Sequence, residues 1–159
     1  MPEEVQSQII QTMKPLLEDW SGQKLSTDES DVLVYGIRRY FKGAWLALHV
    51  DEFPRVISAI LQVSFIFVYI LTSAVCLHFA FQIDQKVNKP WHLNVVNHDG
   101  ERQSLLLNPG EMLFYESAKI PHGRQFPFDG EYFDNLFIHF LPVQMKDHLP
   151  KKLSINDIL

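Results

Sequence analysis

His49 and Asp51 are separated by one residue inside an apolar run, a spacing that can bring an imidazole and a carboxylate to a single metal ion. Residues i and i+2 of a β-strand project from the same face, so the two side chains would converge. His122, which follows a later apolar run, is the candidate third ligand. Two histidines and one carboxylate on one face of a metal leave positions open for further ligands, as in non-haem Fe(II) sites. These residues alone predict a metal-binding β domain in which Fe(II) is one candidate metal.

The surrounding pattern predicts one helix followed by strands. Apolar residues recur at three- and four-residue spacing over residues 2–20, which indicates an amphipathic helix that ends at Ser21-Gly22. From Val32 onward, apolar runs of four to eight residues are separated by turn dipeptides, a pattern typical of strands. The expected strands are Val32–Tyr40, Trp45–Val50, Val56–Gln62, Trp91–Asn97, Gln103–Leu107, Met112–Glu116 and Asn135–Leu141.

Three turn signals separate the expected strands. Asp99-Gly100 and Asp129-Gly130 suit hairpin turns, which need residues with positive φ. Asn108-Pro109-Gly110 predicts a turn just before the Met112–Glu116 strand. Seven or more short strands behind one packing helix predict a mainly β fold, with a double-stranded β-helix (jelly roll) as the favoured architecture.

Composition limits the class of protein and its partners. With 159 residues, the chain has the size of one domain, and 47% hydrophobic with 21% charged residues excludes disorder. Fourteen Lys and Arg against nineteen Asp and Glu give a net charge of -5, which argues against nucleic acid as the main partner. Cys76 is the single cysteine, so no internal disulfide is possible, and the cysteine content does not identify the cellular compartment.

Targeting signals are equally uninformative. The first thirty residues lack a basic region followed by an apolar core, and Asn156–Leu159 is not a retention tetrapeptide. The cytoplasm is therefore the default expectation, and the ER lumen is the alternative if an N-terminal region is missing.

Two blocks of the sequence resemble the prolyl 4-hydroxylase-like family of Fe(II)- and 2-oxoglutarate-dependent dioxygenases. The segment VYGIRRYFKGAWLALHVD at residues 34–51 is similar to the iron-binding strand of that family, with Tyr40, Gly43, His49 and Asp51 at the family's spacing. The segment NPGEMLFYESAKIPHG at residues 108–123 is similar to the family's turn, strand and distal histidine. The resemblance runs from about residue 14 to 142.

The resemblance implies a reaction as well as a fold. Members of the family use Fe(II), 2-oxoglutarate and dioxygen, with ascorbate as a further expected cofactor, and they release succinate and CO2. It implies that His49, Asp51 and His122 are the metal ligands and catalytic residues, and that Tyr40 hydrogen-bonds the co-substrate. The expected substrate is a protein or peptide side chain, with prolyl the favoured residue.

The expected co-substrate clamp departs from the family pattern. Family members usually place Lys or Arg nine or ten residues after the distal histidine, where this chain has Glu131 and Tyr132. Arg124 is the replacement candidate, because it would share the face of His122 in a continuing strand and offers a bidentate fork to a carboxylate. Arg38, which has the same parity as Tyr40, is the second candidate.

Other conspicuous side chains have simpler interpretations. Trp45 and Trp91 are expected in the core, together with the phenylalanines. His139 is expected to line the barrel interior as a buried neutral histidine, in preference to a fourth ligand.

An anomalous apolar segment interrupts the β region. Ser64–Phe81 is eighteen residues without a charged side chain, long enough to be a candidate membrane span. Compared with the family, Val63–Gln82 resembles an insert: a membrane-inserting segment, an apolar lid or a retained intron. Val63-Ser64 can be encoded by GTAAGT and Phe81-Gln82 by TTTCAG, a splice donor and acceptor, which favours the intron.

The sequence therefore predicts three parts and leaves three functions open. The parts are a helix and linker at residues 1–30, the dioxygenase domain at 31–142 with the insert at 63–82, and a tail at 143–159. The favoured function is the dioxygenase. A catalytically silent metal-binding jelly roll without an intact 2-oxoglutarate clamp is the second, and a protein anchored in a membrane by Ser64–Phe81 is the third.

Overall fold

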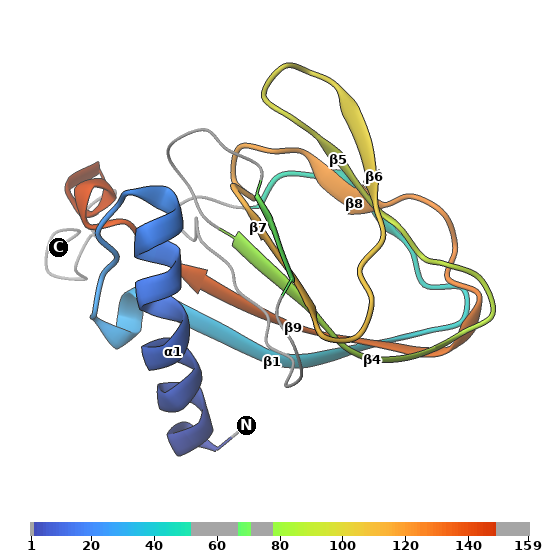
Figure 1. Cartoon of the computed structure of the whole chain (residues 1–159), viewed down its shortest axis with the longest axis horizontal. Coiled ribbons are helices and arrows are strands. Elements are labelled where there is room, and N and C mark those ends of the chain that lie inside the picture. The colour runs from blue at the N-terminus through green and yellow to red at the C-terminus, as the bar shows by residue number, and fades with distance from the viewer. Residues whose placement is uncertain (1, 52–66, 71–77, 149–159) are drawn as a thin grey trace, which may run out of the picture.

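The computed structural model describes residues 2–51, 67–70 and 78–148, which form one α-helix and two β-sheets (Figure 1). The predicted mainly β fold with an N-terminal helix is confirmed in these ranges. The elements are α1 (Glu3–Ser21), β1 (Val32–Phe41), β2 (Leu46–His49), β3 (Phe67–Ile70), β4 (His78–Val87), β5 (Leu93–Val96), β6 (Arg102–Leu105), β7 (Glu111–Tyr115), β8 (His122–Arg124) and β9 (Gly130–Phe140), with 3-10 helices at Glu29–Asp31 and Val143–His148.

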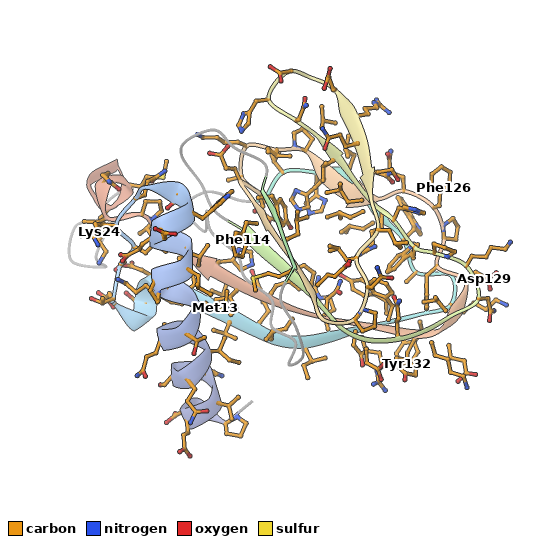
Figure 2. All side chains as sticks on the ribbon, in the orientation of Figure 1. Met13, Lys24, Phe114, Phe126, Asp129 and Tyr132 are labelled. Carbon is orange, nitrogen blue, oxygen red and sulfur yellow. The ribbon has the colours of Figure 1, made fainter. Side chains whose placement is uncertain are left out.

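Helix α1 packs its apolar side on the larger sheet. Met13 and Leu17 are fully buried, and Trp20 meets Phe114 of β7 with ring centroids 5.4 Å apart. Figure 2 shows Met13 in the space between α1 and the strands. The helix ends at Gly22, whose φ of 66° allows its N–H to reach the Glu18 carbonyl at 2.9 Å. The predicted helix is therefore confirmed, including its C-terminal glycine.

The strands form a five-stranded sheet in the order β1-β9-β4-β7-β3 and a four-stranded sheet in the order β2-β8-β5-β6. The pairs are antiparallel except for β3 with β7. Gly100 (φ 80°) lies in the turn between β5 and β6, and Gly110 (φ 94°) precedes β7, as expected. Gly130 is instead the first residue of β9, which begins five residues before the predicted Asn135.

Strand β4 crosses the expected end of the insert. The backbone of residues 78–82 pairs with β9 on one side, and residues 78–81 pair with β7 on the other, so this part of the segment lies in the middle of the larger sheet. The predicted strand Val56–Gln62 lies outside the described residues. Within the described ranges, no helix combines the length and the apolar character needed to cross a membrane.

Aromatic residues divide between core and surface. Trp91, Phe128 and Phe133 form a buried cluster, so the expectation for Trp91 is confirmed. The expectation for Trp45 is wrong, because its side chain is 63% exposed just before the short strand β2. Phe126 is 72% exposed and stands at the surface in Figure 2.

Candidate metal centre

The candidate ligands lie where two neighbouring strands of the smaller sheet meet. His49 is the last residue of β2 and is directly paired with His122, the first residue of β8. Asp51 follows two residues after His49 and turns its carboxylate to the same place. The pairing of β2 with β8 is irregular between Leu46 and His49, and in this stretch the backbone of β2 passes close to Gly123. The predicted convergence of these three residues is thereby found in the structure.

Gly123 makes this close crossing possible. A β-carbon at that position would lie 2.6 Å from the carbonyl oxygen of Ala47 and 2.8 Å from that of Leu46. Both contacts are far shorter than van der Waals separation and involve backbone atoms, which cannot rotate away. The glycine between the buried side chains of His122 and Arg124 therefore lets β2 lie against β8.

The three potential ligand atoms point at one another. One atom each from His49, Asp51 and His122 lies within 4.8 Å of the others, so the group could hold a metal ion. Oδ1 of Asp51 is 3.3 Å from Nε2 of His49 and 3.8 Å from Nε2 of His122. The two imidazole centroids are 4.5 Å apart.

The other ring nitrogens fix the orientation of both imidazoles. Nδ1 of His49 lies 2.8 Å from the Ala47 carbonyl oxygen, and Nδ1 of His122 lies 2.9 Å from that of Ile120. A carbonyl only accepts, so each Nδ1 carries the proton and each Nε2 is left with its lone pair. This arrangement is the one that metal-binding histidines use.

Ser117 orients the carboxylate in the same way. Its hydroxyl donates to Oδ2 of Asp51 at 2.6 Å, and the Asp51 N–H donates to the Ser117 carbonyl oxygen at 2.9 Å. Oδ1 is thus the oxygen that faces the two histidines. The serine is fully buried at the end of β7. Donor set and orientation both fit a divalent transition metal such as Fe(II).

The ionisation of the three side chains differs with their surroundings. Hydrogen bonding to Asp51 raises the pKa of His49, whereas burial lowers the pKa of His122. Burial alone would raise the pKa of Asp51, but the bond with His49, the neighbouring His122 and the Ser117 hydroxyl lower it. A carboxylate and a neutral buried imidazole are the forms that bind a metal.

A cavity of about 200 Å³ opens beside the triad and is lined from both sheets. On β1, Arg38 and Tyr40 face it, and Asn135, the β9 partner of Arg38, lines it as well. The predicted common face of Arg38 and Tyr40 is therefore present. A water molecule takes up about 30 Å³ in the liquid. By this measure the cavity has room for a small molecule, and larger groups would enter it only in part.

Arg124 is the most unusual residue of this cavity. It is 3% exposed, its guanidinium lies 4.6 Å from the Trp91 ring and 4.4 Å from the Phe133 ring, and Nη1 donates to the Trp91 carbonyl oxygen. No carboxylate in the described part of the chain lies within ion-pair distance of it. Burial lowers its pKa from 12.5 to about 10. A buried cation without an anion is costly, so Arg124 is a candidate binding residue for an anionic ligand.

The residues at the family's usual clamp positions do not face the cavity. Glu131 is exposed and pairs with Lys86, its Oε1 2.7 Å from Nζ. Tyr132 donates its hydroxyl to Asp84 and lies under Arg39, on the outer side of the sheet (Figure 2). The sequence departs from the family pattern at these two positions, and in the structure neither side chain can meet a ligand in the cavity.

Tyr115 is a cavity residue that the sequence analysis missed. It ends β7, is 2% exposed and meets the ring of His122 edge-on at 4.8 Å. Burial raises its pKa well above 10, so its hydroxyl remains a hydrogen-bond donor. Tyr115 and Tyr40 both interact electrostatically with Arg124. The alternation of side chains along the predicted strand Met112–Glu116 would have identified Tyr115 only if the sequence had also shown which face of that strand points inward.

His139 lines the cavity, as predicted, and is 5% exposed. Its ring contacts Tyr35 edge-on at 4.9 Å. It is not one of the three residues whose ligand atoms converge.

Solved structures with a similar fold are prolyl 4-hydroxylases. The Pseudomonas putida prolyl-4-hydroxylase is 16% identical over 70% of this chain and 51% of its own, with a TM-score of 0.50. The prolyl 4-hydroxylase from Phytophthora capsici is 11% identical over 96% of this chain and 46% of its own, with a TM-score of 0.56. At such identities the likeness shows the fold alone, and the chain spans about half the length of either neighbour. No protein-family model and no curated protein sequence matches the chain.

Proposed function

We propose that this chain is an Fe(II)- and 2-oxoglutarate-dependent dioxygenase built on a double-stranded β-helix, which hydroxylates a protein or peptide side chain. The observation that carries the proposal is one cavity that contains both a His-Asp-His group and a buried arginine to which the described residues supply no counter-ion. The likeness in fold to prolyl 4-hydroxylases favours prolyl as the residue modified. Ascorbate as a supporting reductant stays a prediction.

The protein's part in this chemistry is to bind and orient. His49 and His122 would hold the metal through Nε2, and Asp51 through Oδ1, because their remaining polar atoms are already hydrogen-bonded. Fe(II), when bound with 2-oxoglutarate, supplies the redox chemistry that couples release of succinate and CO2 to oxidation of the substrate. The buried side chains of β8 and the aromatic rings of the lining would limit the access of water to that chemistry.

Arg124 would bind the distal carboxylate of 2-oxoglutarate. It projects from β8 on the same face as His122, two residues away, so a ligand can touch both at once. A guanidinium bound to a carboxylate makes stronger hydrogen bonds than neutral groups do. Tyr40 and Tyr115 line the same cavity, and their hydroxyls would donate to the same carboxylate.

A silent metal-binding protein is the second candidate function. It is favoured by the outward positions of Glu131 and Tyr132, which leave the family's usual cation without an equivalent. In that case the triad would bind metal while 2-oxoglutarate would not bind. The two functions therefore differ in a ligand-binding measurement that needs no knowledge of the substrate.

The deciding experiment is an anaerobic titration of the protein with Fe(II) and then with 2-oxoglutarate. We expect a visible metal-to-ligand charge-transfer band, produced when a keto acid binds Fe(II) through two atoms. The band should be lost in His49→Ala and retained in His92→Ala, which alters an exposed histidine outside the cavity. Iron binding without a band would favour the silent metal-binding protein. The absence of iron binding would contradict both functions.

The division into a helical segment at residues 1–30, a dioxygenase domain at 31–142 and a tail at 143–159 stays a proposal. Residues 63–66 and 71–77 of the expected insert and residues 149–159 of the tail are outside the described ranges. The anchoring of Ser64–Phe81 in a membrane would require a continuous span, and residues 67–70 and 78–81 of it are strands.

A further inference from the structure

Two arginines line the cavity at different depths. Arg124 is buried between aromatic rings, whereas Arg38 lies exposed on β1 on the same cavity wall as Tyr40. Among the described residues that line the cavity, these two arginines and Asp51 of the triad carry the formal charges. A chain with a net charge of -5 therefore presents a locally positive cavity.

Arg38 differs from its basic neighbours because no carboxylate of the described residues pairs with it. Arg39 makes two hydrogen bonds to Asp134 at 2.8 and 2.6 Å on the opposite face of β1, and Lys42 lies 3.8 Å from Asp129. In the described part of the protein, Arg38 has no ion pair, and its guanidinium lies 5.9 Å above the ring of Phe137. The cation that β1 turns toward the cavity is thus available to a ligand.

The mouth of the cavity also offers an exposed aromatic surface. Tyr35 is 50% exposed, lines the cavity and packs on His139. Its place in the strand follows from the irregular register between Val34 and Gly36, which adds a residue to β1. An aromatic ring next to a cation can bind an apolar side chain and a carboxylate that stand close together in one peptide.

We propose that the substrate is an acidic peptide segment, with an Asp or Glu side chain close to the residue that is modified, and that Arg38 binds this carboxylate. The inference rests on the proposed function, in which Arg124 takes the single distal carboxylate of 2-oxoglutarate. Arg38 then determines which peptides are preferred, through a charge-assisted hydrogen bond to the acidic side chain of the substrate at the mouth of the cavity.

The test uses capped peptides, acetylated and amidated so that a side chain supplies their only charge. Each contains one proline, with Asp, Glu, Asn, Gln or Lys at one of the two positions on either side. Hydroxylation is followed by the gain of one oxygen in mass spectrometry. The variants are Arg38→Gln and Arg38→Glu, and the matched control is Lys42→Gln, which removes one positive charge just after the end of β1 and outside the cavity lining.

We expect the acidic peptides to be preferred by at least about tenfold in kcat/KM over their amide counterparts, the range of a hydrogen bond to a charged group. Arg38→Gln should remove this preference, mainly through KM, and Arg38→Glu should shift it toward the Lys peptides. Lys42→Gln should retain it. Fe(II) and 2-oxoglutarate should bind Arg38→Gln within about twofold of the unaltered protein, because the distal carboxylate is here assigned to Arg124, the first candidate for the clamp, and the substrate to Arg38, the second.

Three results would overturn the inference. The first is equal turnover of acidic and amide peptides, and the second is a protein that binds Fe(II) and 2-oxoglutarate but modifies no acidic peptide. The third is a loss of 2-oxoglutarate affinity in Arg38→Gln, which would make Arg38 part of the co-substrate clamp. Failure to form the charge-transfer band in the unaltered protein would instead contradict the proposed function, so the two failures are distinguishable.

Discussion

Ser117 holds Asp51 by both its backbone and its side chain, and this contact decides which carboxylate oxygen faces the histidines. The hydroxyl of Ser117 is 2.6 Å from Oδ2, and its carbonyl oxygen accepts from the Asp51 N–H at 2.9 Å. Oδ1 is thereby left 3.3 Å from Nε2 of His49. Ser117, which follows β7, thus orients Asp51, the candidate metal ligand that follows β2.

Ser117→Ala should weaken metal binding without removing any ligand. Loss of the hydroxyl frees the carboxylate to rotate, and the loss of such outer contacts typically lowers metal affinity by about 10–100-fold. Titration with Co(II), a substitute that does not oxidise readily, measures the effect. Ser104→Ala, at an exposed serine of β6, is the control and should bind Co(II) normally. Equal affinity in the two variants would show that Ser117 does not position Asp51.

Arg124→Met should separate stability from ligand binding. At pH 7 the buried guanidinium is charged although burial lowers its pKa to about 10, so it is carried at a cost in the unliganded protein. We expect the melting temperature to rise by about 2–4 °C, corresponding to about 1 kcal/mol, and 2-oxoglutarate binding to be lost. Calorimetry and the charge-transfer band measure the two effects. A marked fall in melting temperature would mean that Arg124 serves mainly to hold Trp91.

Gly123→Ala should displace β2 from β8. The new methyl group would meet two backbone carbonyl oxygens at 2.6 and 2.8 Å, so the strands must separate and His49 must move from His122. We expect destabilisation by about 1–3 kcal/mol and at least a tenfold loss of metal affinity. Gly130→Ala meets the Lys86 carbonyl oxygen at 2.5 Å but lies outside the cavity. It should be destabilised similarly while binding metal normally, and a loss of affinity in both variants would contradict a local effect.

Metal affinity should fall as the pH is lowered. The bond with Asp51 raises the pKa of His49 above 6.5, so below that raised pKa the metal must displace a proton from this ring. We expect the apparent affinity to decrease by about tenfold per pH unit there. His122 should add to the decrease only at lower pH, because burial lowers its pKa. Co(II) titrations between pH 5.5 and 8 measure this, and a flat profile would contradict the assigned protonation.

Deletion of residues 63–82 should preserve the candidate site. In the shortened chain Ser58–Gln62 would directly precede Ile83, at the sequence positions that His78–Gln82 occupy in β4. The five residues Ser-Ala-Ile-Leu-Gln would then be available for the pairing with β7 and β9. We expect the deletion variant to bind Fe(II) and 2-oxoglutarate as the complete chain does, with less aggregation. Loss of folding in the variant would show that the segment is an integral part of the protein.

Sequence reasoning succeeded where strand periodicity alone decides the outcome. The common face of Arg38 and Tyr40, both in β1, follows from the two-residue repeat of a strand. The same repeat predicted the convergence of His49 with Asp51, which the structure completes beyond the end of β2 through the contact of Asp51 with Ser117. The same rule placed Arg124 beside His122. These relations are local, and each needs only the knowledge that the segment is extended.

The features that sequence reasoning missed depend on which strands become neighbours. Tyr115 faces the cavity because β7 is covered on its other face by α1, and Trp45 is exposed because β2 begins only at Leu46. Comparison with the family placed residues 78–82 in an insert, and in the structure they form the first half of β4. A strand with neighbours on both sides can be apolar throughout, so composition could not distinguish the two cases.

The pairing of β1 with β9 has a consequence for the way the protein reaches its native state. The first and last strands lie side by side, and Leu25 forms a further bridge to Pro142. Contacts between such distant parts of a chain form slowly, because closure of a long loop must come before them. The cavity between β1, β8 and β9 cannot exist in a partly folded chain. In the proposed function, a metal with its co-substrate would therefore bind late, once the strands that line the cavity have come together.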